Sequence, residues 1–532
     1  MENSPVNSYL TYLNINCPTL DAESLVHINT ILHNTRWEDP ISALDFNNIA
    51  VVALVEAEQC SDISLRNMYI EMALEALNEG RKLEEYPLCS AHLSIILALM
   101  GEMEQAMQLA FPLWMTTLHF IYGNSESILP AIAYIPSDIN FLKSAGSSKT
   151  LQETLSAKTG AVQCLLLLTE ALSRSLLVFY NKQGLRMLHL AQQIFPSLAA
   201  VNLKLGISSI VNSQLEGLLY LHRAREADPD NATILQSLYL AYRELQQTDV
   251  ANFWLSEGEK LRQKNPECLE VQWARLAENK NFTYVPFEHQ LLLAVEPSFR
   301  SIVTSVLIAE GDWFETEMEF WRTWIKPGMT VIDVGANVGV YTFSAARQVG
   351  EGGRVFAVEP FSGCIRCLEE TCRVNHLSWV KVYAAAASDQ NGTVLLSLSS
   401  ASELNEIVPS SKAAEMNPNG FEKVTCLTLD SLIEAETLTQ VDFLKIDAEG
   451  HELSVLLGSE RLLSEFSPVI LYENRAGSQG SNRPVAEYLM GRGYQLFRYQ
   501  PYVQQLIPIN MEEEDWQKYL NLIALPVQPI NS

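Results

Sequence analysis

The apolar positions divide the chain into two halves with different periods. From about Asp21 to Ala277 apolar residues recur every three or four positions, and this spacing predicts a succession of amphipathic helices. The pattern fails at residues 277–290, where polar residues, a proline and strand formers replace it. Beyond this junction short apolar runs alternate with helical patterns, which predicts a largely parallel sheet covered by helices. We therefore expect a multidomain α + α/β protein, with a helical domain at 1–280 and an α/β domain at 281–532.

The helical half contains an internal repeat. Three segments with a shared pattern carry Pro196, Pro229 and Pro266, which are 33 and 37 residues apart. Each proline follows one apolar helix and precedes another, so this half resembles a tetratricopeptide array. Such repeats stack into a concave groove that commonly holds a peptide or a partner domain. We expect either a protein partner there, or helices that only self-associate or pack on the second half.

The charge balance and the cysteines limit the partners and the compartment. The formal net charge is −27, so the surface would repel nucleic acid and anionic membranes. The nine cysteines are odd in number and scattered, and no basic end followed by an apolar core begins the chain, so we expect a cytoplasmic protein without a secretory signal. Cys364, Cys367 and Cys372 lack a nearby fourth zinc ligand, and no metal site is predicted from spacing.

One window is apolar enough to raise the question of a membrane span. Residues 160–180 are rich in leucine, but Glu170 and Arg174 lie inside the window at a four-residue spacing. These charges would be costly in lipid, whereas they can pair on one exposed helix face in water. We expect a core helix and no membrane span.

The stretch "VIDVGANVGVYTFSAA" combines a buried strand, a glycine turn and a helix. Gly335 and Gly339 permit a tight turn, and the helix that follows aims its amides at the crevice. A dinucleotide fingerprint would need glycines where Asn337 and Val340 stand, and no G-K-[ST] closes a phosphate loop. The ligand is therefore expected to be held without phosphate contacts.

The next strands indicate a nucleoside. Glu359 ends the strand "RVFAVEP" 26 residues after Asp333, where a carboxylate can accept hydrogen bonds from both ribose hydroxyls. Asp333 would attract an amino group, and the small residues before Ser388 leave room for a flat ring. S-adenosylmethionine fits these features.

Six ordered motifs carry a family resemblance. They are "DVGANVGVYT" (333–342), "AVEP" (357–360), "AAAASDQNGTV" (384–394), "TLDSL" (428–432), "KIDAEGHE" (445–452) and "PVILYE" (468–473). Together they resemble the FkbM family of S-adenosylmethionine-dependent methyltransferases, over roughly residues 311–499. The resemblance implies a class I fold with a seven-stranded mixed sheet. It also implies, in most members, O-methylation of a hydroxyl on a sugar, polyketide or other small metabolite.

The resemblance also implies a set of cofactor-binding residues. The methionine part of the cofactor would lie along one group, the ribose at a second and the adenine at a third. These groups are Asp333, Gly335, Ala336, Asn337, Gly339 and Thr342; Glu359 and Pro360; and Ser388 and Asp389.

Candidate acid–base groups follow the later strands. Lys445 and Asp447 are two apart on one strand and share a face, so Lys445 can hold Asp447 ionised or orient the acceptor oxygen. Asp447 or Glu449 would accept the proton of the acceptor hydroxyl or orient the hydroxyl; alternatively the Lys445 and Asp447 pair only fixes the turn. His451 is a candidate general base, or else a packing or capping residue.

The end of the following strand and a long loop are candidate acceptor contacts. Glu473 and Asn474 are expected to bind the substrate. The loop 399–423 is expected either to cover the acceptor site or to be a surface excursion. Two alternatives remain for the function: methylation of a peptide or carrier-bound substrate recruited by the helical repeats, and a non-catalytic scaffold that binds the cofactor.

Overall fold

The computed structural model divides into two compact units. It describes residues 5–83, 86–122, 128–136, 147–175, 182–194, 196–277, 280–398, 405–408, 420–475, 482–512 and 514–527. One unit consists of residues 1–195 and 500–505, and the other of residues 196–499 and 506–532. Residues 196–280 thus share a unit with the sheet, whereas the expected domain boundary at 280/281 stays a prediction.

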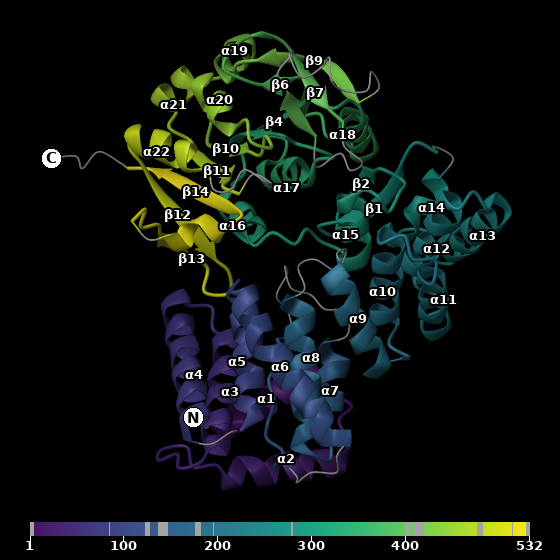
Figure 1. Ribbon diagram of the computed structural model, residues 1–532, viewed down its shortest axis with the longest axis vertical. Helices are drawn as coiled ribbons and strands as arrows, with labels where there is room; N and C mark the ends of the chain where they lie inside the picture. The colour runs from purple at the N-terminus through teal and green to yellow at the C-terminus, as the bar shows by residue number, and fades with distance from the viewer. Residues whose placement is uncertain are drawn as a thin grey trace. The chain divides into compact units, whose positions relative to one another are not determined.

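In the described part of residues 5–194, all the regular structure of the first unit is helical (Figure 1). Its helices are α1 (Pro5–Asn16), α2 (Ala22–Asn34), α3 (Ala43–Gln59), α4 (Ile63–Leu83), α5 (Pro87–Leu99), α6 (Met103–Tyr122), α7 (Ser147–Leu155), α8 (Gly160–Ser175) and α9 (Lys182–Ile194). Helix α8 contains most of the leucine-rich window discussed above. Within it, Arg174 Nη2 lies 2.7 Å from Glu170 Oε1 and forms the expected ion pair. Both side chains are buried, so the expected exposed face is wrong and the pair lies inside the unit. Among the described residues, no helix has both the length and the apolar character needed to cross a bilayer.

An extended segment, residues 128–136, lies buried inside this helical unit. Residues 131–135 are each at most 1 % exposed, yet they belong to no sheet. Their backbone groups hydrogen-bond to side chains of the surrounding helices instead. The hydroxyl of Tyr9 donates a hydrogen bond to the carbonyl of Ala133 and accepts one from the amide of Ala133. The hydroxyl of Tyr12 forms the same two hydrogen bonds with Ile135. Gln163 forms the same reciprocal pair with Ala131. Such pairing is required because a buried amide without a partner costs about 1–3 kcal/mol.

His92 completes this arrangement in its neutral form. The amide of Tyr134 donates to Nε2 at 3.1 Å, so Nε2 carries no proton and Nδ1 donates to Asn47 Oδ1 at 2.8 Å. Burial lowers the pKa of His92 to about 4.

The depressed pKa predicts a loss of stability with falling pH. Below pH 6.5 the unfolded histidine binds a proton that the folded one does not, so the stabilisation is present at neutral pH and lost as the pH falls toward 4. Between pH 7.5 and 5.5 the loss amounts to about 1.4 kcal/mol. In urea unfolding, the free-energy difference between the wild type and His92→Gln is expected to shrink by this amount. A difference that does not change with pH would contradict the assignment.

The second unit begins with helical hairpins. Its first helices are α10 (Ala199–Val211), α11 (Gly217–Ala227), α12 (Ala232–Glu244), α13 (Thr248–Lys264), the short 3-10 helix η1 (Leu269–Val271) and α14 (Gln272–Leu276). Pro196, Pro229 and Pro266 each lie between two helices, as the repeat predicts. A Cβ on Gly217 would lie 2.5 Å from the carbonyl oxygen of Gly206, so the two glycines let α10 and α11 approach closely. The helical array is therefore consistent with the predicted repeat.

In the sheet that follows, strands alternate with helices along the chain, as expected of an α/β domain (Figure 1). Its strands are β3 (Thr330–Val334), β4 (Arg354–Glu359), β5 (Val380–Ala384), β10 (Phe443–Ile446), β11 (Val469–Glu473), β12 (Tyr494–Gln500), β13 (Gln505–Pro508) and β14 (Asn521–Pro526). The spatial order is β13-β12-β14-β11-β10-β3-β4-β5, and β14 runs antiparallel to both neighbours. The mixed sheet is confirmed, but among the described residues it has eight strands because β13 extends the edge beyond the seven expected.

Two smaller groups of strands accompany the main sheet. The pair β1 (Thr283–Phe287) and β2 (Leu291–Val295) is antiparallel. A second sheet has the order β6-β9-β7-β8, from β6 (Ala386–Ala387), β7 (Gly392–Ser397), β8 (Glu406–Val408) and β9 (Phe421–Leu427). Most of the predicted loop 399–423 lies outside the described residues, and its role stays a prediction.

Helices cover the main sheet on both faces. They are α15 (Ile302–Glu310), α16 (Glu317–Trp324), α17 (Val340–Val349), α18 (Ser362–Asn375), α19 (Leu429–Ala435), α20 (Glu452–Leu457), α21 (Glu460–Glu465) and α22 (Arg483–Gly491), with the 3-10 helix η5 (Glu514–Lys518). Ile332 and Leu444 pack in one core with residues of α19 to α22. On the other face Phe443 contacts Trp321 of α16, which in turn contacts Tyr341 of α17. The cysteines of α18 are free thiols, and Cys364 and Cys367 are buried as expected.

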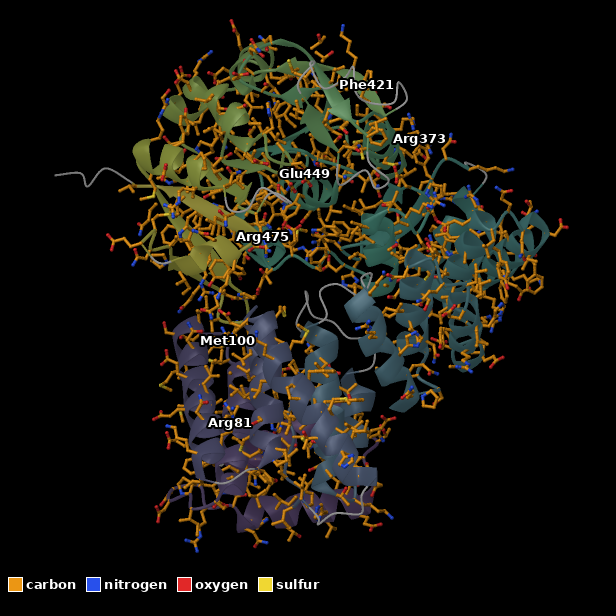
Figure 2. All side chains as sticks on the ribbon, viewed as in Figure 1. Arg81, Met100, Arg373, Phe421, Glu449 and Arg475 are labelled. Atoms are coloured by element: carbon orange, nitrogen blue, oxygen red, sulfur yellow. The ribbon has the colours of Figure 1, made fainter. Side chains whose placement is uncertain are left out.

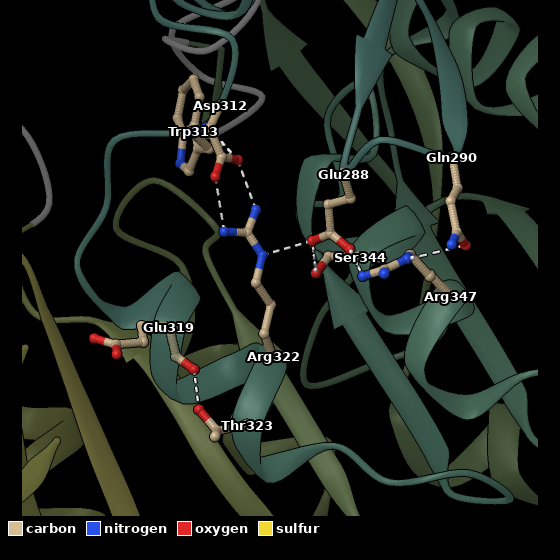
Figure 3. Close-up of polar contacts among 9 residues, drawn as sticks. All are labelled: Glu288, Gln290, Asp312, Trp313, Glu319, Arg322, Thr323, Ser344 and Arg347. Carbon is tan, nitrogen blue, oxygen red and sulfur yellow. Dashed lines mark hydrogen bonds and ion pairs between the residues drawn. The ribbon is translucent and has the colours of Figure 1, made fainter. Parts of the chain in front are cut away.

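A buried ion-pair network ties the β1–β2 turn to α16 and α17 (Figure 3). Arg322 donates to Glu288 Oε1 at 2.6 Å and to both oxygens of Asp312. The Glu288 carboxylate, only 4 % exposed, also accepts from Ser344 and Arg347. Because this carboxylate joins three partners, the network holds the helices that flank β3 and the glycine turn.

Candidate active site

The glycine turn lies where the strand order reverses. The neighbours β4 and β5 lie on one side of β3, and β10 on the other, which makes the carboxyl ends of β3 and β10 the switch point of the sheet. The amide of Gly335 donates to the carbonyl of Val358 at 2.9 Å, and the amide of Asp447 to that of Val334 at 3.1 Å. A Cβ on Gly335, whose φ is +72°, would lie 1.6 Å from the carbonyl oxygen of Asp447. Only glycine fits, so the turns after β3 and β10 are in direct backbone contact.

Glu359 connects the glycine turn to the end of β4. Its carboxylate accepts a hydrogen bond from the amide of Asn337 and another from that of Phe361, both at 2.8 Å. Asn337 has a φ of +49°, and its own side chain accepts from the next amide, that of Val338. Burial raises the pKa of Glu359 to about 7, although the two amides act in the opposite direction. The carboxylate is 6 % exposed and anchors the turn.

Asp333 and Lys445 are neighbours on paired strands. The parallel register of β3 and β10 aligns the two residues, and Lys445 Nζ lies 4.0 Å from Asp333 Oδ1. Thr342 donates to Asp333 Oδ2 at 2.6 Å, whereas the buried Oδ1 has no hydrogen-bond partner. Burial raises the pKa of Asp333. Burial alone would lower the pKa of Lys445, but the carboxylates of Asp447 and Asp333 raise it.

Three carboxylates converge beyond Lys445. Asp447 and Glu449 follow β10, and Glu473 ends β11; one oxygen from each lies within 4.8 Å of the others. Figure 2 labels Glu449, and also Arg475 just past the end of β11. Glu449 has a φ of +48°, an uncommon conformation for a residue with a side chain. Lys445 Nζ forms an ion pair with Asp447 Oδ2 at 2.8 Å. The predicted catalytic and substrate-binding carboxylates therefore share one site.

His451 contacts a different group. Its Nε2 lies 3.0 Å from the hydroxyl of Ser388, and that hydroxyl donates to Asp389 Oδ1 at 3.1 Å. Burial lowers the pKa of His451, and the charge of Asp389 partly opposes this shift. His451 thus lies against the predicted adenine corner, and its proposed role as a base stays a prediction.

The remaining predicted residues have structural contacts. Asn474 is fully buried and donates to the carbonyls of Trp516 and Tyr519, while its Oδ1 has no hydrogen-bond partner. Gly339, with a φ of +100°, is the N-cap of α17. Ala336 is buried, whereas Pro360 is partly exposed at the end of β4. Their predicted roles at the cofactor are not tested by these contacts.

An acidic group that precedes β3 was not predicted from the sequence. Tyr341 donates to Glu315 Oε2 at 2.6 Å, and Asn521 donates to the same oxygen at 2.9 Å. Glu317 lies beside them, and burial raises its pKa to about 7. The ring of Tyr341 lies 4.6 Å from Lys445 Nζ, which connects this group to the three carboxylates. The available signal was the four acidic residues among the aromatic residues of "GDWFETEMEF".

The backbone contact predicts a large effect of one methyl group. Gly335→Ala is expected to destabilise the protein by more than about 3 kcal/mol, since the new Cβ overlaps the Asp447 carbonyl. Gly311→Ala is the matched control: its φ is +76°, but nothing lies within 4 Å of the added methyl group, so about 1 kcal/mol of strain is expected. Thermal unfolding of both variants measures the difference, and equal losses would contradict the steric account.

The comparisons agree with the architecture. Residues 333–496 match the family model described as the methyltransferase FkbM domain. Residues 333–496 therefore form an FkbM methyltransferase domain, and the predicted cofactor, S-adenosylmethionine, is that of this family. The search of curated proteins gave no significant match.

Several solved structures resemble part of the chain. A methyltransferase FkbM from Methylobacillus flagellatus is 17 % identical with a TM-score of 0.25, covering 42 % of this chain and 55 % of that one. A SAM-dependent methyltransferase from Aquifex aeolicus is 17 % identical (TM-score 0.24; 40 % and 88 % covered). An O-methyltransferase from Bacillus cereus in complex with SAH is 16 % identical (TM-score 0.25; 40 % and 81 % covered). The chain spans about half the length of the Methylobacillus protein, and the family assignment rests on the family model.

Proposed function

We propose that the FkbM domain transfers a methyl group from S-adenosylmethionine to a hydroxyl of a small acceptor, such as a sugar or another metabolite. The observation that carries the proposal is the convergence of Asp447, Glu449 and Glu473 at the strand ends next to the glycine turn. Carboxylates beside a methyl donor can orient a hydroxyl and accept its proton.

The cofactor fits the charge of the site. S-adenosylmethionine carries a positive sulfonium and an amino group, and Asp333, Glu359 and Asp447 supply negative charge around the turn. Oδ1 of Asp333, which has no hydrogen-bond partner and lies 4.0 Å from Lys445 Nζ, can accept a hydrogen bond from a cationic group.

Glu359 is suited to the ribose. Its two oxygens already accept from the amides of Asn337 and Phe361, which fixes the plane of the carboxylate. Each oxygen keeps a further lone pair for a hydroxyl donor. The His451 and Ser388 contact would position the corner against which the adenine packs.

The acceptor would be activated by the three carboxylates. Bound S-adenosylmethionine supplies the electrophilic methyl group, whose bond to sulfur breaks as the bond to the acceptor oxygen forms. Asp447 or Glu449 takes the hydroxyl proton, so that the products are a methyl ether and a neutral thioether. Lys445 holds the Asp447 carboxylate at 2.8 Å and so fixes its direction. Alignment is the main contribution of the protein to such an in-line displacement.

The ribose assignment is tested by pairing a variant with a cofactor analogue. Glu359→Ala is expected to weaken binding of S-adenosylhomocysteine by about 10- to 100-fold, because hydrogen bonds to a charged acceptor contribute roughly 1.5–3 kcal/mol. Binding of the 2′,3′-dideoxy analogue, which lacks the hydroxyl donors, is expected to change much less. Isothermal titration of the full chain measures both.

The control and the acceptor screen complete the experiment. Glu351→Gln, an exposed carboxylate after α17, is expected to leave both affinities unchanged. Equal losses for the two ligands would show that Glu359 acts only by anchoring the turn. Transfer of labelled methyl groups to a panel of sugars and hydroxylated metabolites then tests O-methylation, and absence of any cofactor binding would refute the proposed function.

A further inference from the structure

The three carboxylates are unusual among the described residues. Asp447, Glu449 and Glu473 form the only group there of three or more histidine, cysteine or acidic side chains with suitably close ligand atoms. The ligands come from two strand ends, with separations of two and 24 residues. Such separations match no metal-binding motif, which is why the sequence predicted no metal site.

Glu473 is the member of this group whose surroundings most clearly indicate a bound cation. Its side chain is buried, with the residue 8 % exposed, and its Oε2 has no hydrogen-bond partner. A buried carboxylate oxygen without a partner has lost its hydration, so a proton or a cation at this oxygen would stabilise the side chain.

Lys445 is shared between two carboxylates. Its Nζ pairs with Asp447 at 2.8 Å and also lies 4.0 Å from Asp333. Asp447 in turn converges with Glu449 and Glu473 on a common point. A cation at that point would relieve the repulsion.

We propose that Asp447, Glu449 and Glu473 bind one divalent cation of the hard, oxygen-preferring class, Mg²⁺, Mn²⁺ or Ca²⁺. The all-oxygen donor set excludes the nitrogen and sulfur ligands typical of zinc. Metal–oxygen distances of about 2.0–2.6 Å for these ions allow ligand oxygens up to roughly 4–5 Å apart. The observed limit of 4.8 Å falls within this range for Ca²⁺ and needs only a small closure of the side chains for Mg²⁺.

The cation would also define the acceptor. Three protein ligands leave coordination positions open, and an acceptor with two neighbouring oxygens would fill two of them. This part rests on the proposed function. A coordinated hydroxyl loses its proton more readily, so a cation would assist the proton transfer to Asp447 or Glu449 described above.

Metal binding is tested without cofactor or acceptor. Full-length protein treated with EDTA is titrated with MnCl₂, MgCl₂ and CaCl₂ by calorimetry, and bound Mn²⁺ is followed by electron paramagnetic resonance. One ion per chain is expected, with a Kd on the order of 10⁻⁵–10⁻³ M. Glu473→Gln is expected to weaken binding at least tenfold, whereas the exposed control Glu351→Gln leaves it unchanged. Absence of stoichiometric binding, or full binding by Glu473→Gln, overturns the proposal.

The fold of the variant and the rival cation are tested separately. Glu473→Gln keeps the size of the side chain and removes a repulsive charge, so its thermal midpoint is expected to be equal to or above that of the wild type. The rival is that the carboxylates balance the sulfonium. In that case Glu473→Gln, without added metal, would weaken S-adenosylmethionine more than S-adenosylhomocysteine, which lacks the sulfonium charge; this result overturns the metal site. Stoichiometric metal binding without any cofactor binding would instead refute the proposed function alone.

Discussion

The site depends on the backbone contact between Gly335 and Asp447. These two residues follow adjacent parallel strands at the switch point, and a single methyl group on Gly335 would overlap the Asp447 carbonyl. The contact brings the glycine turn after β3 and the turn after β10 to one place. Glu452 supports the second turn, since its carboxylate accepts from the amides of Ala448 and Gly450. The direction of Asp447 is therefore set by backbone packing as much as by Lys445.

Negative charge at this place is concentrated by topology. The parallel register puts Asp333 beside Lys445, and the next strand adds Glu473 at its end. Glu315 reaches the same region from the segment before β3, held by Tyr341 and Asn521. Carboxylates gathered in partial burial lose solvation and repel one another, so each is stabilised by a proton, by an amide or by a cation.

The helical unit encloses an extended segment whose backbone needs hydrogen-bond partners. Its buried segment at 131–135 has no strand partner, so side chains supply the hydrogen bonds that a sheet would otherwise provide. The side chains of Tyr9, Tyr12 and Gln163 each donate a hydrogen bond to the carbonyl of one residue in the segment and accept one from its amide. The interior of this unit is thus occupied by its own chain. The recruitment of a peptide or carrier by the helical repeats stays a prediction.

Local patterns in the sequence determined the element types, the glycine turn and the family. The apolar strand before Gly335, the acid at Glu359 and the strand that leads to Asp447 follow from side-chain periodicity and backbone constraints that act over a few residues. The eighth strand, the burial of the Glu170 and Arg174 pair and the contact between His451 and Ser388 depend on residues distant in the sequence. The same holds for the meeting of Glu473 with Asp447 and Glu449, whose separation along the chain carries no signal. Only the strand order decides which carboxyl ends are neighbours, and so only the tertiary structure decided that three predicted carboxylates share one point.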